Sequence, residues 1–159
     1  MKYMGIISQY FDDMSESEKF RLYNVYNWRK QFGLKAVNFS EFCRILDRCF
    51  CIYEENFEFF LYFEVYAESS ELLSFHIIYD KRVIRKYLLD FDNLFTYVEY
   101  IFPLFKGFEG LTNDKVTAKI AKRYGFTVNY DTESKKYEVT RRFKNGNAKI
   151  QTADSSINS

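Results

Sequence analysis

The stretch AKIAKRYGFTVNYDTESKKYEVTRRF, residues 118–143, decides the fold. It predicts a helix that ends at Gly125, because glycine tolerates the left-handed conformation that closes helices, followed by two strands joined by the turn DTES. Thr112 or Asp114 can cap the start of this helix. The apolar residues expected to face the core are Val116, Ile120 and Tyr124. The chain is therefore expected to end in a helix and a β-hairpin.

Two further helices are predicted in the N-terminal third. Ser15 and Glu18 form a capping box, and Gly33 closes the segment that follows. A second helix is expected to open near Ser40, since apolar residues recur there at spacings of three and four. Its stripe consists of Phe42, Ile45, Leu46, Cys49 and Phe50. Residues 4–10 are a candidate for a first strand.

The central part of the chain predicts a β-hairpin and another helix. The runs NFEFFLYFEVYA (56–67) and LLSFHIIY (72–79) alternate along their length and are separated by the polar group ESSE. From residue 82 to residue 95 the apolar period becomes helical. We expect a strand at the start of residues 96–105 and a loop over residues 106–114.

This order of elements, with its closing helix, glycine, phenylalanine and hairpin, resembles the GNAT (N-acetyltransferase) fold. The resemblance is best over residues 57–143 and strongest in RYGFTV at 123–128. It implies an α/β (α+β) fold with a mixed, mostly antiparallel sheet flanked by helices, as one domain over residues 1–143 followed by a polar tail over 144–159. In size and in its use of Lys, Asn, Tyr and Phe, the chain also resembles small GNAT-like structural proteins of tailed bacteriophages.

Length and composition agree with one globular domain. The chain has 159 residues, of which 47% are hydrophobic and 21% aromatic. No apolar run reaches the length of a membrane span, and the N-terminus lacks the pattern of a signal peptide, so we expect a cytoplasmic protein, or one assembled there into a virion. Cys43, Cys49 and Cys51 predict reduced thiols rather than a disulfide framework.

The resemblance implies a site for acetyl-CoA that this sequence does not match. GNAT proteins bind the pyrophosphate with an Arg/Gln-x-x-Gly-x-Gly/Ala loop, whose glycines let backbone N–H groups approach the phosphates. The corresponding stretch YDKRVIRKY (79–87) has no glycine, and Val83 and Ile84 are β-branched. The family's usual general acid, a tyrosine four residues before the helix-closing glycine, is replaced by Ala121. We expect no cofactor, with only nonspecific anion candidates, which are Lys81, Arg82 and Arg85.

Other catalytic constellations are not predicted either. His76 is the only histidine, and we expect it to be a satisfied residue inside a strand rather than a base. One histidine without a Cys-x-x-Cys spacing argues against a metal site. The acidic pairs Glu54/Glu55 and Asp12/Asp13 are expected to be solvated ends of elements. No catalytic or metal-binding residue is therefore assigned.

Charge is distributed unevenly along the chain. Residues 115–149 hold ten Lys and Arg against three acidic residues, whereas residues 1–114 hold thirteen against eighteen. This predicts a basic hairpin that contacts an acidic protein or a phosphate backbone, or else ordinary solvated lysines. The candidate partner-binding residues are Lys135, Lys136, Arg141, Arg142 and Lys144, with Ile150 and Ile157 as apolar anchors of the tail on a neighbouring subunit. The second face of the strand at 56–67 is covered within the chain or offered to a partner, and its aromatic residues are Phe60, Tyr62 and Tyr66.

Three functional hypotheses result. The leading one is a non-catalytic component of a larger symmetric assembly on a degenerate GNAT-like fold, such as a ring, connector, tail or internal protein of a bacteriophage virion. The first alternative is an N-acetyltransferase that uses acetyl-CoA with an atypical cofactor loop. The second is a nucleic-acid-binding module that uses the basic hairpin. Binding of acetyl-CoA would separate the first two, and a steep salt dependence of binding would identify the third.

Overall fold

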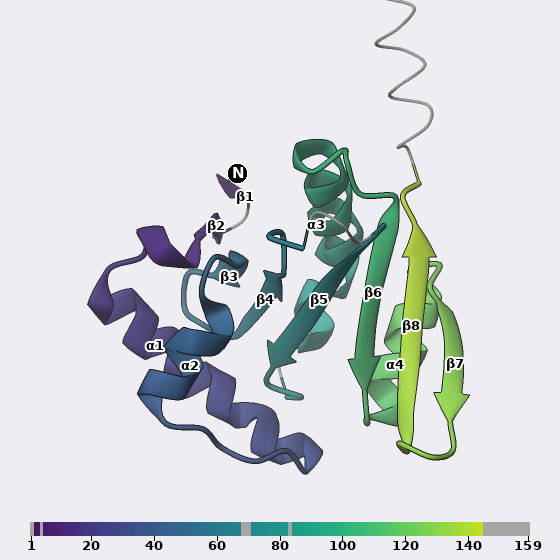
Figure 1. The fold of residues 1–159 in the computed structure, drawn as a ribbon, viewed down its shortest axis with the longest axis horizontal. Helices are drawn as coiled ribbons and strands as arrows, with labels where there is room; N and C mark the ends of the chain where they lie inside the picture. Colours follow the sequence, from purple (N-terminus) through teal and green to yellow (C-terminus); the bar gives the residue numbers. More distant parts are fainter. Residues whose placement is uncertain (1, 4, 68–70, 83, 145–159) are drawn as a thin grey trace, which may run out of the picture. The chain divides into compact units, whose positions relative to one another are not determined.

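The computed structural model describes residues 2–3, 5–67, 71–82 and 84–144 (Figure 1). The chain divides into two compact units. Unit 1 comprises Met1–Ala67 and Ser74–Tyr87, and unit 2 comprises Glu68–Leu73 and Leu88–Ser159. Each unit combines helices with antiparallel strands, so the α+β class expected from the sequence is confirmed.

Unit 1 contains an antiparallel sheet with two helices packed on one face. Its strands pair in the order β1-β2-β3-β4-β5, and Tyr62 of β4 lies opposite His76 of β5. The helices and strands are β1 (Lys2–Tyr3), β2 (Ile6–Tyr10), α1 (Glu16–Tyr26), α2 (Phe39–Leu46), β3 (Phe50–Glu54), β4 (Phe59–Phe63) and β5 (Leu72–Tyr79), with 3-10 turns at Phe11–Asp13, Asn27–Phe32 and Ile84–Tyr87.

Large aromatic side chains join the helices of unit 1 to its sheet. Tyr26 of α1, Phe42 of α2 and Tyr62 of β4 are all buried, and the Tyr26 ring centroid lies 5.2 Å from that of Phe42 and 6.3 Å from that of Tyr62. Phe60 is also buried on this face. The aromatic face of β4 is thus covered within the chain at Phe60 and Tyr62, whereas Tyr66 beyond the strand is exposed.

Unit 2 contains three antiparallel strands in the order β6-β8-β7, with two helices on one face (Figure 1). Phe95 of α3 packs edge-on against Phe108 of β6 with 4.9 Å between ring centroids, and Phe126, which follows α4, lies 5.4 Å from Phe95. The elements are α3 (Leu88–Ile101), β6 (Gly107–Thr112), α4 (Lys115–Arg123), β7 (Thr127–Asp131) and β8 (Lys136–Arg142).

Local signals in the sequence predicted several boundaries correctly. Ser15 and Glu18 form the capping box at the start of α1. Gly33 and Gly125 both adopt the left-handed conformation, with φ of 78° and 84°, at the positions where helical segments end. Asp114 caps α4 by accepting a hydrogen bond from the Thr117 N–H. The two predicted hairpins are confirmed as β4–β5 and β7–β8.

The assignment of Cys49 and Phe50 to the second helix is wrong. α2 ends at Leu46, and Arg48 turns the chain with a φ of 61°. Phe50 opens β3, which is buried along its whole length between β2 and β4. The aromatic and β-branched side chains of this segment fit a strand as well as a helical stripe, and pairing with two neighbouring strands decides the outcome.

The predicted strand at 96–105 and loop at 106–114 are also wrong. α3 continues to Ile101 and buries Phe91, Phe95 and Val98, which recur at spacings of four and three. The strand is instead β6, which pairs with β8 along its full length although it contains two glycines. In α4 the buried residue is Ala118, and Val116, which was predicted to face the core, is 60% exposed.

Gly107 gives a first testable prediction. A Cβ atom at this position would lie 2.5 Å from the carbonyl oxygen of Arg141 and 2.9 Å from Leu72 Cδ2. Gly107→Ala is therefore expected to force β6 away from β8 and to lower the free energy of unfolding by about 1–3 kcal/mol, as measured by urea denaturation. Gly110→Ala adds the same methyl group to the same strand and is the control; equal losses in both variants would contradict the steric explanation.

No helix within the described ranges combines the length and the apolar character that crossing a bilayer requires.

Candidate functional site

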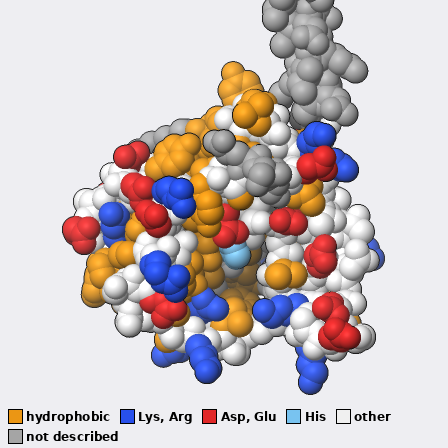
Figure 2. All heavy atoms as spheres, in the orientation of Figure 1, with side chains coloured by type: hydrophobic (Ala, Val, Ile, Leu, Met, Phe, Trp, Pro, Cys, Tyr) orange, Lys and Arg blue, Asp and Glu red, His pale blue; other side chains and the backbone are white. Residues whose placement is uncertain are grey.

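The chain's only histidine lies beside a carboxylate in unit 1. His76 is on β5, and Glu64 directly follows β4; the Glu64 N–H donates to the Ser74 carbonyl at 3.0 Å, which brings the two side chains to the same place on the sheet. His76 Nε2 lies 3.3 Å from Glu64 Oε2, and the two side chains are 40% and 32% exposed. Figure 2 shows the imidazole, in pale blue, at the molecular surface. His76 has the partner that the sequence analysis expected, but it is more exposed than a core histidine.

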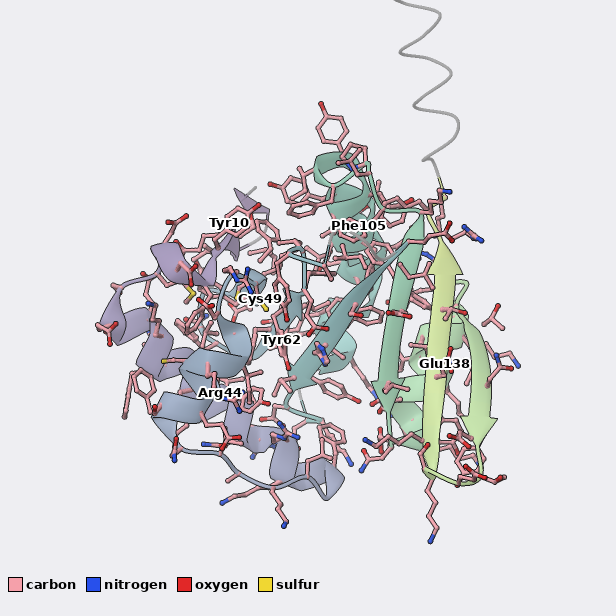
Figure 3. The ribbon with its side chains drawn as sticks, viewed as in Figure 1. Tyr10, Arg44, Cys49, Tyr62, Phe105 and Glu138 are labelled. Carbon is pink, nitrogen blue, oxygen red and sulfur yellow. The ribbon has the colours of Figure 1, made fainter. Side chains whose placement is uncertain are left out.

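Aromatic and polar side chains hold this pair in place. The Tyr62 ring, labelled in Figure 3, stacks on the imidazole with 4.4 Å between centroids and 13° between planes. The Tyr66 hydroxyl donates to Glu64 Oε1 at 3.1 Å, and the Arg48 guanidinium lies 4.8 Å from the centroid of the Tyr66 ring. The orientation of His76 is therefore set by one stacking contact and one carboxylate that is itself hydrogen-bonded.

This arrangement suits His76 to accept a proton. The hydrogen bond from His76 lowers the pKa of Glu64 by more than burial raises it, so the carboxylate stays ionised. When Nε2 carries the imidazole proton and donates it to Glu64, Nδ1 keeps a free lone pair. An imidazole oriented by a carboxylate is a common general base.

Nucleophilic catalysis by a cysteine is not supported at this site. The thiols of Cys43, Cys49 and Cys51 are free, and the last two are buried. Burial raises the pKa of Cys49 to about 12, so this sulfur is a protonated thiol near neutral pH.

Protonation of Glu64 is expected to change the free energy of unfolding. Because its pKa in the folded chain is lowered from 4.5, its ionised form stabilises the fold above about pH 4.5, and this contribution is lost as the pH falls through the folded-state pKa. Glu64→Gln is expected to weaken the loss of stability on acidification. The measurement is the free energy of unfolding in urea from about pH 7 to about pH 3. A difference between wild type and variant that stays constant over this range would show that Glu64 is not an ionised partner of His76.

The cations predicted as anion candidates lie in the turn that follows β5, and one of them is already paired. The Asp80 carboxylate accepts the backbone N–H of Arg82 at 2.9 Å and the guanidinium Nη2 at 2.7 Å. Lys81 Nζ lies 4.6 Å from the Phe32 ring centroid, and Arg85 is exposed. Val83 lies outside the described residues. Arg82 is thus engaged by a carboxylate that the sequence analysis did not consider.

Ala121 is on α4, as the sequence predicts, and its side chain has no proton to donate. The nearby Tyr124 is half-buried, with its ring centroid 6.3 Å from that of Phe91, and burial raises the pKa of its hydroxyl. These contacts support the interpretation of Tyr124 as a packing residue.

The basic hairpin is only partly exposed. Lys135, Lys136 and Arg142 are exposed, and Lys144 binds Asp92. Arg141 was predicted to contact a partner, but its side chain is only 4% exposed and lies over the rings of Phe95, Phe108 and Phe126. The prediction rested on charge counts, which do not place a side chain on a face, whereas alternation along β8 puts Arg141 on the same face as the buried Val139.

The remaining predicted positions add no chemistry. Within the described ranges, no group of three or more His, Cys, Asp and Glu side chains is placed to hold a metal ion. Ile150 and Ile157, the predicted anchors of the tail, lie outside those ranges. The contact of Lys135, Lys136 and Arg142 with an acidic partner stays a prediction.

Comparisons with solved structures identify the fold. An acetyltransferase from Thermus thermophilus superposes with a TM-score of 0.65 at 11% identity, covering 89% of this chain and 99% of that one. The chain has the GNAT fold. The GNAT superfamily phosphinothricin acetyltransferase from Sinorhizobium meliloti, in complex with AcCoA, gives a TM-score of 0.58 at 8% identity and covers 91% of this chain and 92% of its own.

A third similar structure is the Campylobacter jejuni N-acetyltransferase PseH in complex with acetyl coenzyme A. Its TM-score is 0.59 at 15% identity, and the match covers 86% of this chain and 98% of PseH. A scan against protein-family models and a search of curated proteins find no match. At these identities the likeness establishes the GNAT fold and leaves the activity to be argued from the residues.

The described residues do not fit the pyrophosphate of acetyl-CoA in the usual way. Counted from Arg82, the two glycine positions of the Arg-x-x-Gly-x-Gly pattern fall on Arg85 and Tyr87. The Tyr87 hydroxyl donates to Glu58 at 3.1 Å, and its ring packs edge-on against Phe59 at 4.8 Å. Open backbone, which a phosphate needs, is replaced here by two large side chains, of which Tyr87 has partners of its own.

Proposed function

We propose that the protein transfers an acyl group from a thioester to an amine, with His76 accepting the proton of the amine. The observation that carries this proposal is the partly exposed His76–Glu64 pair on the sheet of a GNAT fold. The similar structures support it because they are described as acetyltransferases, two of them in complex with acetyl-CoA. This is the first alternative of the sequence analysis, without its commitment to acetyl-CoA as the donor.

The proposed reaction requires the protein only to orient the reacting groups and to transfer the proton of the amine. The amine nitrogen attacks the thioester carbon, a C–N bond forms, and the C–S bond breaks. The proton of the attacking nitrogen passes to Nδ1 of His76, and the departing thiolate takes up a proton from solvent. Glu64 stabilises the imidazolium that forms, and Tyr62 keeps the ring in one orientation.

The direct test is an assay of amide formation. The full chain is incubated with S-acetyl thioester donors and a panel of primary amines, and the N-acetyl products are separated and quantified by mass spectrometry. We expect at least one amine to be acetylated faster with the protein than without it. Measurable binding of a donor without acetylation of any amine would overturn the proposal.

A second candidate function is the non-catalytic assembly component that led the sequence analysis. Ala121 and the glycine-free turn favour it, because both remove groups on which GNAT acetyltransferases commonly rely. Its test is a size measurement of the protein alone and with co-expressed neighbouring proteins: a discrete complex, together with no acetylation, would favour it. The structural neighbours described above include no virion protein, so the bacteriophage part of that hypothesis has no support from them.

A further inference from the structure

The turn after β5 contains an anion that belongs to the chain itself. Asp80 is 8% exposed, and its Oδ1 accepts the backbone N–H of Arg82 at 2.9 Å and the guanidinium Nε at 3.1 Å. Its Oδ2 accepts Nη2 at 2.7 Å. These bonds lower the pKa of Asp80, the side-chain bond from Arg82 most of all. The Asp80 carboxylate is therefore ionised at neutral pH and is paired with Arg82.

A diphosphate bound at Arg82 would need the same donors. Phosphate sites at the end of a strand use free backbone N–H groups and a cation that has no closer partner. Here the Arg82 N–H and the Arg82 guanidinium are both committed to Asp80. Of the other cations that follow Arg82, Lys86 binds Glu58 at 2.9 Å and Arg85 is exposed. To use the donors of Arg82, an incoming diphosphate would have to displace Asp80 while approaching its charge.

We propose that Asp80 occupies the place of a donor diphosphate on this turn, so that the protein excludes the nucleotide half of coenzyme A and takes acyl thioesters of a pantetheine-type thiol instead. The choice of donor rests on the proposed function, but the exclusion of the diphosphate does not, because it follows from contacts within the turn. Asp80 is then a specificity-determining residue. Arg82 serves to hold it rather than to bind the donor.

Binding measurements test this without reference to activity. Calorimetric titrations compare S-acetyl-coenzyme A with S-acetylpantetheine, which is the same thioester without the nucleotide and its diphosphate. We expect the wild-type chain to bind both within about threefold of each other. Asp80→Asn should keep the turn, since the amide oxygen can still accept the Arg82 N–H, but should free the guanidinium. This variant is expected to bind the coenzyme A thioester at least about tenfold more tightly than wild type does, and the gain should shrink with added salt.

The matched control is Asp131→Asn. Asp131 accepts the backbone N–H of Glu133 at 3.0 Å, two residues along as in the Asp80 turn, but it lies in unit 2. The Asp131→Asn variant should leave the affinities for both thioesters unchanged. A wild-type chain that binds the coenzyme A thioester more than tenfold better than the pantetheine thioester, or that loses coenzyme A binding on Arg82→Ala, would overturn the proposal. So would an Asp80→Asn variant that folds and gains nothing.

The two proposals fail in different ways. If neither thioester donates to any amine although one of them binds, the acyl transfer is wrong and the binding ratio still reports on Asp80. If acetylation is found and depends on the nucleotide half of the donor, the acyl transfer stands and the role of Asp80 is wrong. If the protein binds neither thioester, pantetheine thioesters are not its donors.

Discussion

Replacing His76 with asparagine is expected to lower the rate of amine acetylation by about 10²–10⁴-fold, the range that a positioned general base contributes. The reason is geometric: His76 is oriented by Glu64 at 3.3 Å and by the Tyr62 ring, and it is exposed enough to reach a bound amine. Asparagine retains a donor for Glu64 but cannot take up a proton near neutral pH. The measurement is kcat and KM with the best amine found in the panel, over a range of pH.

Two companion variants distinguish a base from a structural residue. Glu64→Gln should reduce kcat less than His76→Asn and should shift its pH profile, because Glu64 acts through the imidazole. Glu138→Gln, at an exposed position of β8 in unit 2, removes a carboxylate elsewhere and should leave activity unchanged (Figure 3). A His76→Asn variant that folds and keeps full activity would remove His76 from the mechanism.

Signals confined to a few neighbouring residues were interpreted correctly. A capping box, a left-handed glycine and an aspartate cap each depend on contacts within about one turn of helix. Ser15 and Gly125 could therefore be assigned before any packing was known, and Asp114 was one of two candidate caps. The hairpin β7–β8 is local in the same sense. This is why the GNAT resemblance could be recognised from the C-terminal part of the chain.

Elements that depend on distant partners were missed. β6 has low strand propensity at Gly107 and Gly110, and it is a strand because β8, about thirty residues later, pairs with it. The candidate site has the same origin: Glu64 and His76 meet only in the particular register of β4 and β5. Alternation along the two predicted strands would have placed them on one face, and that signal was available. The pairing of Asp80 with Arg82 was also detectable, because aspartate commonly binds the backbone two residues on.

Replacement of Arg141 is expected to have the largest effect on the free energy of unfolding. Its guanidinium Nη2 lies 3.6 Å from Glu99 Oε2, and the two side chains are 4% and 1% exposed. Nη1 also donates to the Tyr124 carbonyl at 2.8 Å, at the end of α4, where a positive charge is favourable. Arg141→Met is expected to lower the free energy of unfolding by about 3–5 kcal/mol, because it leaves the buried Glu99 carboxylate without the guanidinium. Urea denaturation with circular dichroism measures this change.

The double variant decides whether charge or packing is responsible for that loss. Arg141→Met keeps an apolar stem over Phe95 and Phe126, so the cost should come mainly from the carboxylate that remains, and Glu99→Gln added to it should restore part of the lost stability. Arg142→Ala is the matched control: the next residue on β8 is exposed, and its removal should change the free energy of unfolding by less than about 0.5 kcal/mol. If Arg141→Met were as stable as wild type, Arg141 would be no more than a buried hydrophobic stem. If the double variant were no more stable than Arg141→Met, the loss would come from packing against the three phenylalanines. The ion pair with Glu99 would then not explain why this core contains an arginine.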